Sequence, residues 1–304
     1  MKRIFLSLFL AALVTVIGAC TTTIAPGAPG TLQDDLGRSV NIGEVPGRIV
    51  SIGASTTEIL FALGLGDRIV GCDKYSDYPP ETAKMPKVDA FSSPATITEI
   101  IVGWEPDIVF ALWYSVPDWV TSLENHGVPV FLIAPKGVHD ILSSIELLGK
   151  ATRTEERSTE LTVGMQKRIK AVTDATAGSS RPKVFYEIDG TDPTKPWTAG
   201  PGSFVDDLIR LAGGENVAGT GPSEGFQMTV EAILDSDPDV VLLGDVLWGT
   251  TPESVAVRPG WSKIKAVKDG HVYGVNSDMA SRAGPRIVEA LEEFARLIHP
   301  ELFK

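Results

Sequence analysis

The stretch TEERSTELTVGMQKRIKAVTDATA, residues 154–177, decides how the rest of the chain is organised. Its apolar residues Leu161, Met165, Ile169 and Val172 follow the helical spacing i, i+4, i+8 and i+11, and polar or charged residues fill most other positions. We therefore expect one helix of about 24 residues, which at about 1.5 Å per residue would be about 36 Å long. A helix of that length can bridge two lobes and fix their spacing.

On both sides of this helix, short apolar runs alternate with helical patterns. Such alternation predicts an α/β fold with two Rossmann-like lobes, whose mostly parallel sheets are joined by the long interdomain helix. The expected strands lie near residues 48–51, 69–71, 107–111, 128–132, 183–188, 239–243 and 271–275. The expected helices lie near residues 55–63, 96–104, 117–126, 139–151, 203–212 and 285–298.

The two halves also share a sequence pattern of helix, turn and strand. The matching segments are residues 98–101 with 230–233 and residues 106–109 with 238–241, an offset of 230 − 98 = 132 residues. The repeat predicts two similar lobes, 46–150 and 179–304, joined by the helical segment 151–178. A cleft between such lobes is the expected place for a ligand site.

The start of the chain is typical of an export signal. Two basic residues precede an apolar run over residues 4–17, which is too short to span a membrane and has the length of a signal core. The run is followed by Gly18-Ala19-Cys20, which resembles the bacterial lipobox, so we expect residues 1–20 to be a lipoprotein signal with Cys20 as the lipidated residue. Residues 21–45, which begin with small and turn-forming residues, are expected to be a flexible tether.

Composition argues against several classes of function. Lys and Arg number 27 against 39 Asp and Glu, and the resulting net charge of −12 disfavours a nucleic-acid partner. Two cysteines provide no disulfide framework, and the four histidines lack the spacing of a metal site. Residues 221–225 match the G-x-S-x-G pattern, but no strand precedes them and no helix follows directly. We interpret them as a loop and keep an exported hydrolase using Ser223 as a remote alternative.

Aromatic and polar residues gather in the loops that follow the expected strands. The stretch YSDYPP, residues 75–80, follows the second strand, and Trp113 follows the third. Trp197 lies in a loop with two prolines, and Asp278 and Arg282 follow the last strand. Aromatic rings in loops above a sheet suit a large, flat, partly apolar ligand.

Over residues 48–304 the sequence resembles the periplasmic binding proteins of ABC importers for cobalamin, iron–siderophore complexes and haem. The stretch YSDYPP and residues 277–286, SDMASRAGPR, are most similar to the cobalamin-binding branch. The resemblance implies the helical-backbone periplasmic binding protein fold and a monomer without enzymatic activity, resident cofactor or metal. It implies export to the periplasm or the outer face of the cytoplasmic membrane, with contact to the membrane through the lipid anchor alone.

The same resemblance implies partners and ligand contacts. The partners are a permease dimer with its ATPase subunits and a cobalt corrinoid as cargo, with a ferric siderophore or haem as the alternative cargo. Trp197 and Phe226 match aromatic wall positions, whereas a family member carries tryptophan at the positions of Phe91 and Leu112. The expected ligand contacts are Tyr75, Tyr78, Phe91, Trp113, Trp197, Phe226, Asp278 and Arg282.

Glu99 and Glu231 match the two surface glutamates by which such proteins dock onto permease arginines, one from each lobe. An alternative is that Glu99 forms a capping box with Thr96. That alternative does not account for Glu231, because Met228 stands three residues before it. Like-placed carboxylates on two similar lobes suit a pseudo-symmetric permease dimer, so we expect docking.

Overall fold

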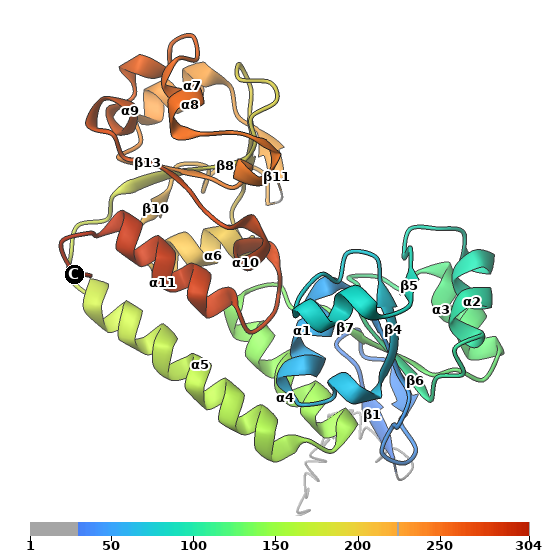
Figure 1. The fold of residues 1–304 in the computed structure, drawn as a ribbon. Coiled ribbons are helices and arrows are strands. Elements are labelled where there is room, and N and C mark those ends of the chain that lie inside the picture. Colours follow the sequence, from blue (N-terminus) through green and yellow to red (C-terminus); the bar gives the residue numbers. More distant parts are fainter. Residues whose placement is uncertain (1–29, 224, 304) are drawn as a thin grey trace, which may run out of the picture.

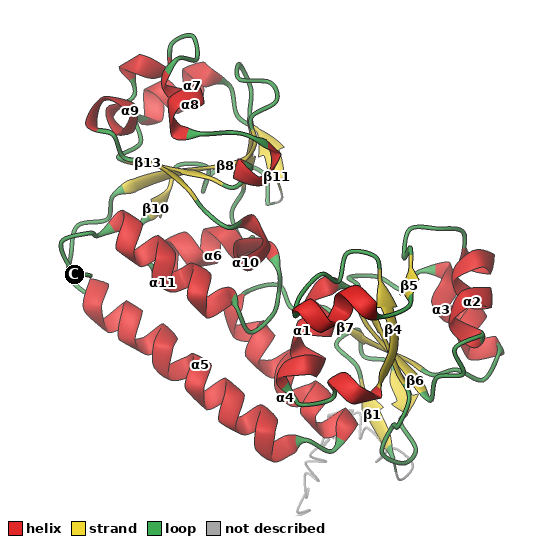
Figure 2. Cartoon of the chain, viewed as in Figure 1, coloured by secondary structure: helices red, strands yellow, loops and turns green. Residues whose placement is uncertain are grey.

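A computed structural model describes residues 30–223 and 225–303. Two α/β lobes lie at opposite ends of the molecule, and helix α5 (Glu155–Thr176) runs from one to the other along one side (Figure 1). We call residues 30–152 the N-terminal lobe and residues 183–298 the C-terminal lobe. In each lobe, helices surround the strands of a central sheet (Figure 2).

The N-terminal lobe contains a parallel sheet of five strands in the order β5-β4-β3-β6-β7. These strands are β3 (Ile49–Ile52), β4 (Ile69–Asp73), β5 (Lys87–Val88), β6 (Ile108–Leu112) and β7 (Val130–Ile133). The helices are α1 (Ala54–Ala62), η1 (Gly66–Arg68), η2 (Pro80–Lys84), α2 (Pro94–Val102), α3 (Asp118–Asn125) and α4 (Val138–Thr152). Parallel strands need crossover connections, which α1, α2 and α3 supply.

The strands of this sheet are nearly continuous apolar runs because helices cover both of its faces. Every residue of β3 and β7 is buried. Successive residues point to opposite faces, so Val109 packs in one cluster with Leu123 of α3, whereas Phe110 packs in another with Ile145 of α4. The loops at the carboxyl ends of the strands therefore project from a rigid sandwich.

The C-terminal lobe contains a sheet of six strands in the order β11-β9-β8-β12-β13, with β10 also paired to β8. Its strands are β8 (Lys183–Asp189), β9 (Trp197–Ala199), β10 (Glu215–Asn216), β11 (Gly225–Gln227), β12 (Val240–Leu243) and β13 (Val272–Gly274). Its helices are α6 (Phe204–Leu211), α7 (Val230–Ser236), η3 (Val246–Trp248), α8 (Pro252–Ala256), η4 (Trp261–Lys263), α9 (Lys265–Asp269), α10 (Ser277–Ser281) and α11 (Ile287–Ile298). Strands β9 and β11 are antiparallel and the others are parallel, so the predicted α/β fold with mostly parallel sheets is confirmed.

Helix α5 has 22 residues and confirms the long helix expected over residues 154–177. It packs against α4 of the N-terminal lobe and α11 of the C-terminal lobe. The stripe residues Met165, Ile169 and Val172 are buried, and they belong to a core cluster that continues to Tyr186 in β8. The two lobes therefore share a hydrophobic core on the side of α5.

The predicted tether is wrong over its second half. Strands β1 (Thr31–Gln33) and β2 (Ser39–Asn41) form an antiparallel hairpin. The hairpin is docked onto β7 by polar contacts: the Asp35 backbone N–H donates to the Leu132 carbonyl at 3.1 Å, and the buried Asp34 side chain accepts from the Leu132 N–H at 3.3 Å. Val40 also enters the core, but strands of three residues with so few buried apolar side chains leave little apolar periodicity in the sequence, which explains the error.

The expected signal, residues 1–20, and its Cys20 lie outside the described residues. Within residues 30–223 and 225–303, no helix is long and apolar enough to cross a membrane. Cys72, the described thiol, is buried in β4, where it packs as a small side chain.

Candidate functional site: an aromatic wall beside an interlobe ion cluster

Aromatic rings from three loops of the N-terminal lobe meet at the carboxyl ends of its strands. Tyr75 follows β4, Phe91 follows β5 and Trp113 follows β6. The Tyr75 and Phe91 ring centroids are 5.8 Å apart, and the Phe91 and Trp113 centroids are 5.5 Å apart. Trp113 in turn contacts the buried Trp119 of α3 at 5.9 Å. We call Tyr75, Phe91 and Trp113 the aromatic wall, and the structure thus brings these three predicted contacts together.

Carboxylates at the strand ends hold the wall in place. Asp73 and Asp89 accept hydrogen bonds from the backbone N–H groups of Tyr75 at 2.9 Å and Phe91 at 3.0 Å. The Lys74 Nζ atom pairs with the Asp89 carboxylate at 2.5 Å, which ties the two loops together and lowers the pKa of Asp89. Phe91 nevertheless stays 71% exposed, so the wall presents an apolar surface to solvent.

A cluster of charged side chains joins the two lobes beside this wall. Arg286 binds the Glu58 carboxylate in a bidentate manner, with N···O distances of 2.9 and 2.6 Å. Arg282 binds Asp77 with distances of 2.6 and 3.2 Å and also reaches Glu58 at 3.3 Å. The interlobe cluster comprises Glu58, Asp77 and Tyr78 from the N-terminal lobe and Asp278, Arg282 and Arg286 from the C-terminal lobe.

Burial and pairing define the electrostatics of the interlobe cluster. Glu58 is only 3% exposed, and a buried carboxylate is tolerated when cations and hydrogen bonds compensate its lost hydration. The hydrogen bonds from Arg282 lower the pKa of Asp77, and those from Arg286 to Glu58 raise the pKa of Arg286. The Arg286 guanidinium also lies 3.9 Å from the centre of the Tyr78 ring, a cation–π contact.

Some of the predicted ligand contacts therefore lie in the aromatic wall, and others lie in the interlobe cluster. Asp278 and Arg282 do form the expected pair, at 3.0 Å, but the Arg282 side chain is 14% exposed and faces three carboxylates. Tyr78 lies against Arg286 rather than in the aromatic wall. A pocket of about 650 Å³ between α1, α5 and α11 is lined by Tyr78 and by no other predicted ligand contact.

Trp197 and Phe226 of the C-terminal lobe do not share a surface. The β9–β11 register pairs Trp197 with Gln227 and Phe226 with Thr198. Paired residues of an antiparallel ladder share a face and successive residues alternate, so the two rings point to opposite faces. The Phe226 ring lies against Gly221, whereas Trp197 is 43% exposed.

The predicted docking glutamates are both exposed, Glu99 on α2 and Glu231 on α7. The capping-box interpretation of Glu99 is wrong, because α2 begins earlier and Ser93 is its N-cap, accepting from the Thr96 N–H at 3.2 Å. Glu99 therefore lies well inside the helix. In Figure 1, α2 lies at the edge of the N-terminal lobe furthest from the C-terminal lobe.

The sequence of this chain is similar to those of periplasmic binding proteins. Residues 49–279 match the family described as periplasmic binding protein. The chain belongs to this family. A relative in Bacillus subtilis, an uncharacterized ABC transporter substrate-binding lipoprotein, is 32% identical over 91% of this chain and 87% of its own. A cobalamin-binding protein of Halobacterium salinarum is 28% identical over 97% of this chain and 84% of its own.

A solved structure extends the likeness to three dimensions. The haem-binding protein RhuT from Roseiflexus, in its apo form, matches with a TM-score of 0.73 and 25% identity, covering 84% of this chain and 98% of that one. This protein is thus a substrate-binding component of an ABC transporter, a family of transport proteins rather than enzymes. Ser223 of the G-x-S-x-G pattern lies exposed in a loop, and the next helix, α7, begins only at Val230.

Three members of the interlobe cluster were not predicted as site residues, although two of them lie in the motifs noted above: Glu58, Asp77 and Arg286. One signal for Glu58 was available, because it is the only charge in the helix ASTTEILFA, residues 54–62. Its partner was not, because Arg286 stands 228 positions further along the chain. In the part of the chain that the structure describes, no group of three potential metal ligands occurs.

Proposed function

We propose that this protein is an exported, lipid-anchored binding protein that captures a corrinoid between its lobes and delivers it to an ABC permease. The observation that carries the proposal is the aromatic wall, a continuous and exposed apolar surface held by fixed loops. A corrin ring is flat and partly apolar, and covering exposed rings with such a ligand is favourable by about 25 cal/mol per Å². The cobalamin-binding relative in Halobacterium supports the same cargo.

Within this proposal the residues divide into three groups. Tyr75, Phe91 and Trp113 contact one face of the ligand, and Trp197 contacts it from the other lobe. Asp278 and Arg282 are the polar contacts. Arg282 releases the Asp77 carboxylate and donates instead to an acceptor on the ligand. The lobes act as the units 46–150 and 179–304, with the hairpin added to the first and residues 151–178 as the connecting strut.

Haem is the second candidate cargo, favoured by the likeness to the haem-binding RhuT. Both ligands are planar metal chelates and would cover the same rings. They differ in the metal, since haem iron commonly takes an axial His, Tyr, Cys or Met from its protein. The aromatic wall supplies one such group, the phenol of Tyr75.

Calorimetric titration of the full chain, purified in detergent, tests the cargo. Cyanocobalamin and cobinamide are expected to bind with micromolar or tighter affinity, and haemin more weakly. Absence of heat with both corrinoids would overturn the corrinoid assignment, and tight binding of haemin alone would replace it with haem. Fractionation of cells expressing Cys20→Ser tests the anchor, because the variant should leave the membrane fraction.

Charge reversal tests the proposed docking of Glu99 and Glu231 onto the permease. Glu99→Arg and Glu231→Arg should leave cargo affinity unchanged and reduce uptake in cells, since opposed charges at an interface steer and orient association. Glu156→Arg, on the exposed part of α5, is the matched control and should leave uptake unchanged. Loss of cargo binding in both test variants would contradict a docking role.

A further inference from the structure

The loop that follows β12 carries two large apolar side chains that are not among the predicted ligand contacts. Leu247 and Trp248 end the short helix η3 and are 62% and 76% exposed. Trp248 and Phe91 are the two most exposed aromatic residues in the described chain. Two adjacent large apolar side chains exposed on one loop form an apolar patch, and patches of this kind suit contact with a ligand or partner.

This loop is held rigidly from beneath. The buried Asp245 carboxylate accepts hydrogen bonds from the Gly190 N–H at 2.9 Å and the Thr250 hydroxyl at 2.7 Å. Val246 packs so closely on Gly274 of β13 that a Cβ atom there would lie 2.7 Å from its Cγ1 atom. The loop that carries Leu247 and Trp248 is therefore held in a fixed position, which reduces the entropy lost when a ligand binds.

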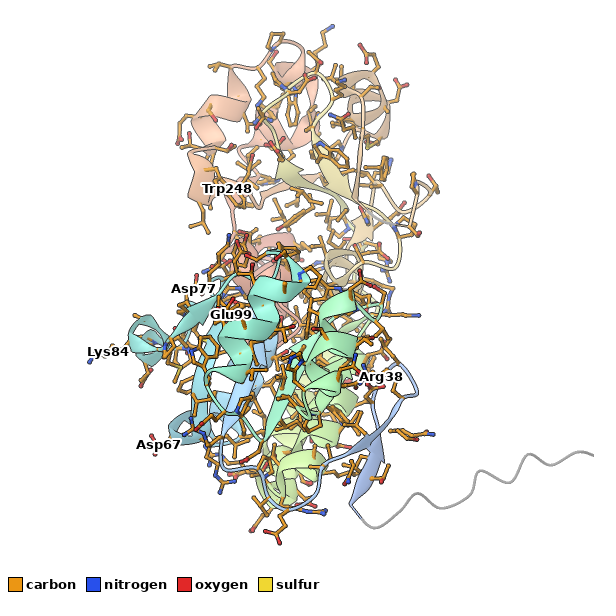
Figure 3. The ribbon with its side chains drawn as sticks, turned by 90° about the vertical axis from the view of Figure 1, so that its right-hand side faces the viewer. Arg38, Asp67, Asp77, Lys84, Glu99 and Trp248 are labelled. Atoms are coloured by element: carbon orange, nitrogen blue, oxygen red, sulfur yellow. The ribbon has the colours of Figure 1, made fainter. Side chains whose placement is uncertain are left out.

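The topology directs this loop toward the N-terminal lobe. Strand β12 pairs in parallel with β13, with Leu243 opposite Gly274, so their carboxyl ends lie at one edge. The chain leaving β13 forms α10 and reaches Arg282, which binds Asp77 of the N-terminal lobe. In the view of Figure 3, Trp248 lies on the C-terminal lobe above Asp77 of the N-terminal lobe, with α10 and α11 closer to the N-terminal lobe.

The internal repeat relates this loop to the loop that supplies Trp113 to the aromatic wall. At the offset of 132 residues, the segment 113–117 between β6 and α3 corresponds to 245–249 between β12 and α8. The first of these segments supplies Trp113 to the wall. Each lobe thus carries a tryptophan in the corresponding loop but at a different position, since the offset aligns Trp113 with Asp245 and Trp248 with Val116.

We propose that Trp248, with Leu247 beside it, forms the C-terminal counterpart of the aromatic wall and covers the face of a planar metal chelate that points away from Phe91. The proposal deepens the proposed function and rests on it. It also supplies a ring that Phe226 does not, because Phe226 is packed against Gly221 on the face opposite Trp197.

Titration of the full chain with cyanocobalamin tests this role, using Trp248→Ala, Trp248→Phe and the control Val257→Ala, an exposed apolar residue of the same region. Trp248→Ala should weaken binding about tenfold or more, as expected for losing one aromatic contact. Trp248→Phe should restore most of the affinity, and Val257→Ala should match the unaltered chain. Unchanged thermal melting in all three would separate loss of contact from loss of fold.

The outcomes separate this inference from the proposed function. Tight binding by the unaltered chain and an equal affinity of Trp248→Ala would overturn the role of Trp248 and leave the function standing. If the unaltered chain binds haemin or a ferric siderophore instead, the corrinoid assignment fails, and a tenfold loss with that ligand supports Trp248. No binding of any of the three would overturn both. Normal cargo affinity with lost uptake in Trp248→Ala would make the residue a permease contact and also overturn the inference.

Discussion

The aromatic wall and the interlobe cluster are built partly from one loop, yet their side chains are satisfied to different degrees. In residues 74–79, Tyr75 joins the wall, whereas Asp77 and Tyr78 join the cluster. The wall leaves apolar rings in contact with water, with Phe91 71% exposed. In the cluster, each charged group has an oppositely charged partner within 3.3 Å.

This difference indicates which of the two regions rearranges its contacts when a ligand binds. Covering the wall removes apolar surface from water and is favourable, whereas opening the cluster would leave a nearly buried carboxylate without its cations. The shared core along α5 opposes lobe separation in the same way. We therefore expect the wall to bind the ligand while the buried Glu58–Arg286 pair keeps the lobes in place, so that the exposed Arg282–Asp77 pair is the part of the cluster that opens and movement on binding is small.

The largest effect is expected from breaking the cluster at its buried end. Glu58→Gln removes the charge that compensates Arg282 and Arg286, whose side chains are 14% and 17% exposed. It should lower the free energy of unfolding by about 3 kcal/mol, measured by urea denaturation.

The matched control for Glu58 is Glu99→Gln, a helical carboxylate that is exposed and has no ion-pair partner among the described residues. It should change the free energy of unfolding by less than about 0.5 kcal/mol. Equal effects of the two substitutions would show that the cluster does not stabilise the lobes.

The next largest effect is expected at the wall and in a different measurement. Phe91→Ala should weaken cyanocobalamin binding about tenfold, equivalent to about 1.4 kcal/mol, while the free energy of unfolding changes little because the ring is mostly exposed. Phe131→Ala, which truncates a fully buried ring, is the control and should instead destabilise the fold by about 3–5 kcal/mol. A stability loss for Phe91→Ala as large as that of the control would mean that the wall is structural.

Much of the fold and part of the site follow from local patterns. The stripe from Leu161 to Val172 predicted α5, because a helix records its buried face in a spacing of three and four residues. The three rings of the wall were predictable together, because parallel strands end at the same edge of a sheet and the residues after them meet there.

The rest of the site depends on contacts between distant residues, which produce no local pattern in the sequence. The partner of Glu58 is set by how two lobes dock, not by spacing along the chain. The face occupied by Phe226 depends on the β9–β11 register, and a shift of one residue would reverse it. The hairpin over residues 31–41 is held by polar contacts to β7 and by the buried Val40, and its strands of three residues are too short to show an apolar period.

The smallest effect is expected at the exposed end of the cluster, and it should depend on pH. Hydrogen bonds from Arg282 lower the pKa of Asp77 in the folded protein below that of a solvated aspartate, about 3.9. The stabilisation is therefore present above about pH 4 and is lost as pH falls through the lowered pKa. Asp77→Asn should reduce the free energy of unfolding at pH 7 by less than about 1 kcal/mol, because the carboxylate is 63% exposed and solvent screens the pair.

Urea denaturation of both proteins between pH 7 and pH 2.5 measures this dependence. The difference between the unaltered chain and Asp77→Asn should be constant down to about pH 4 and then shrink, because protonated Asp77 resembles asparagine in charge. Asp67→Asn, at an exposed position without an ion-pair partner among the described residues, is the control and should show no such change. A difference for Asp77→Asn that stays constant to pH 2.5 would show that its hydrogen-bond geometry, and not its charge, contributes at this end of the cluster.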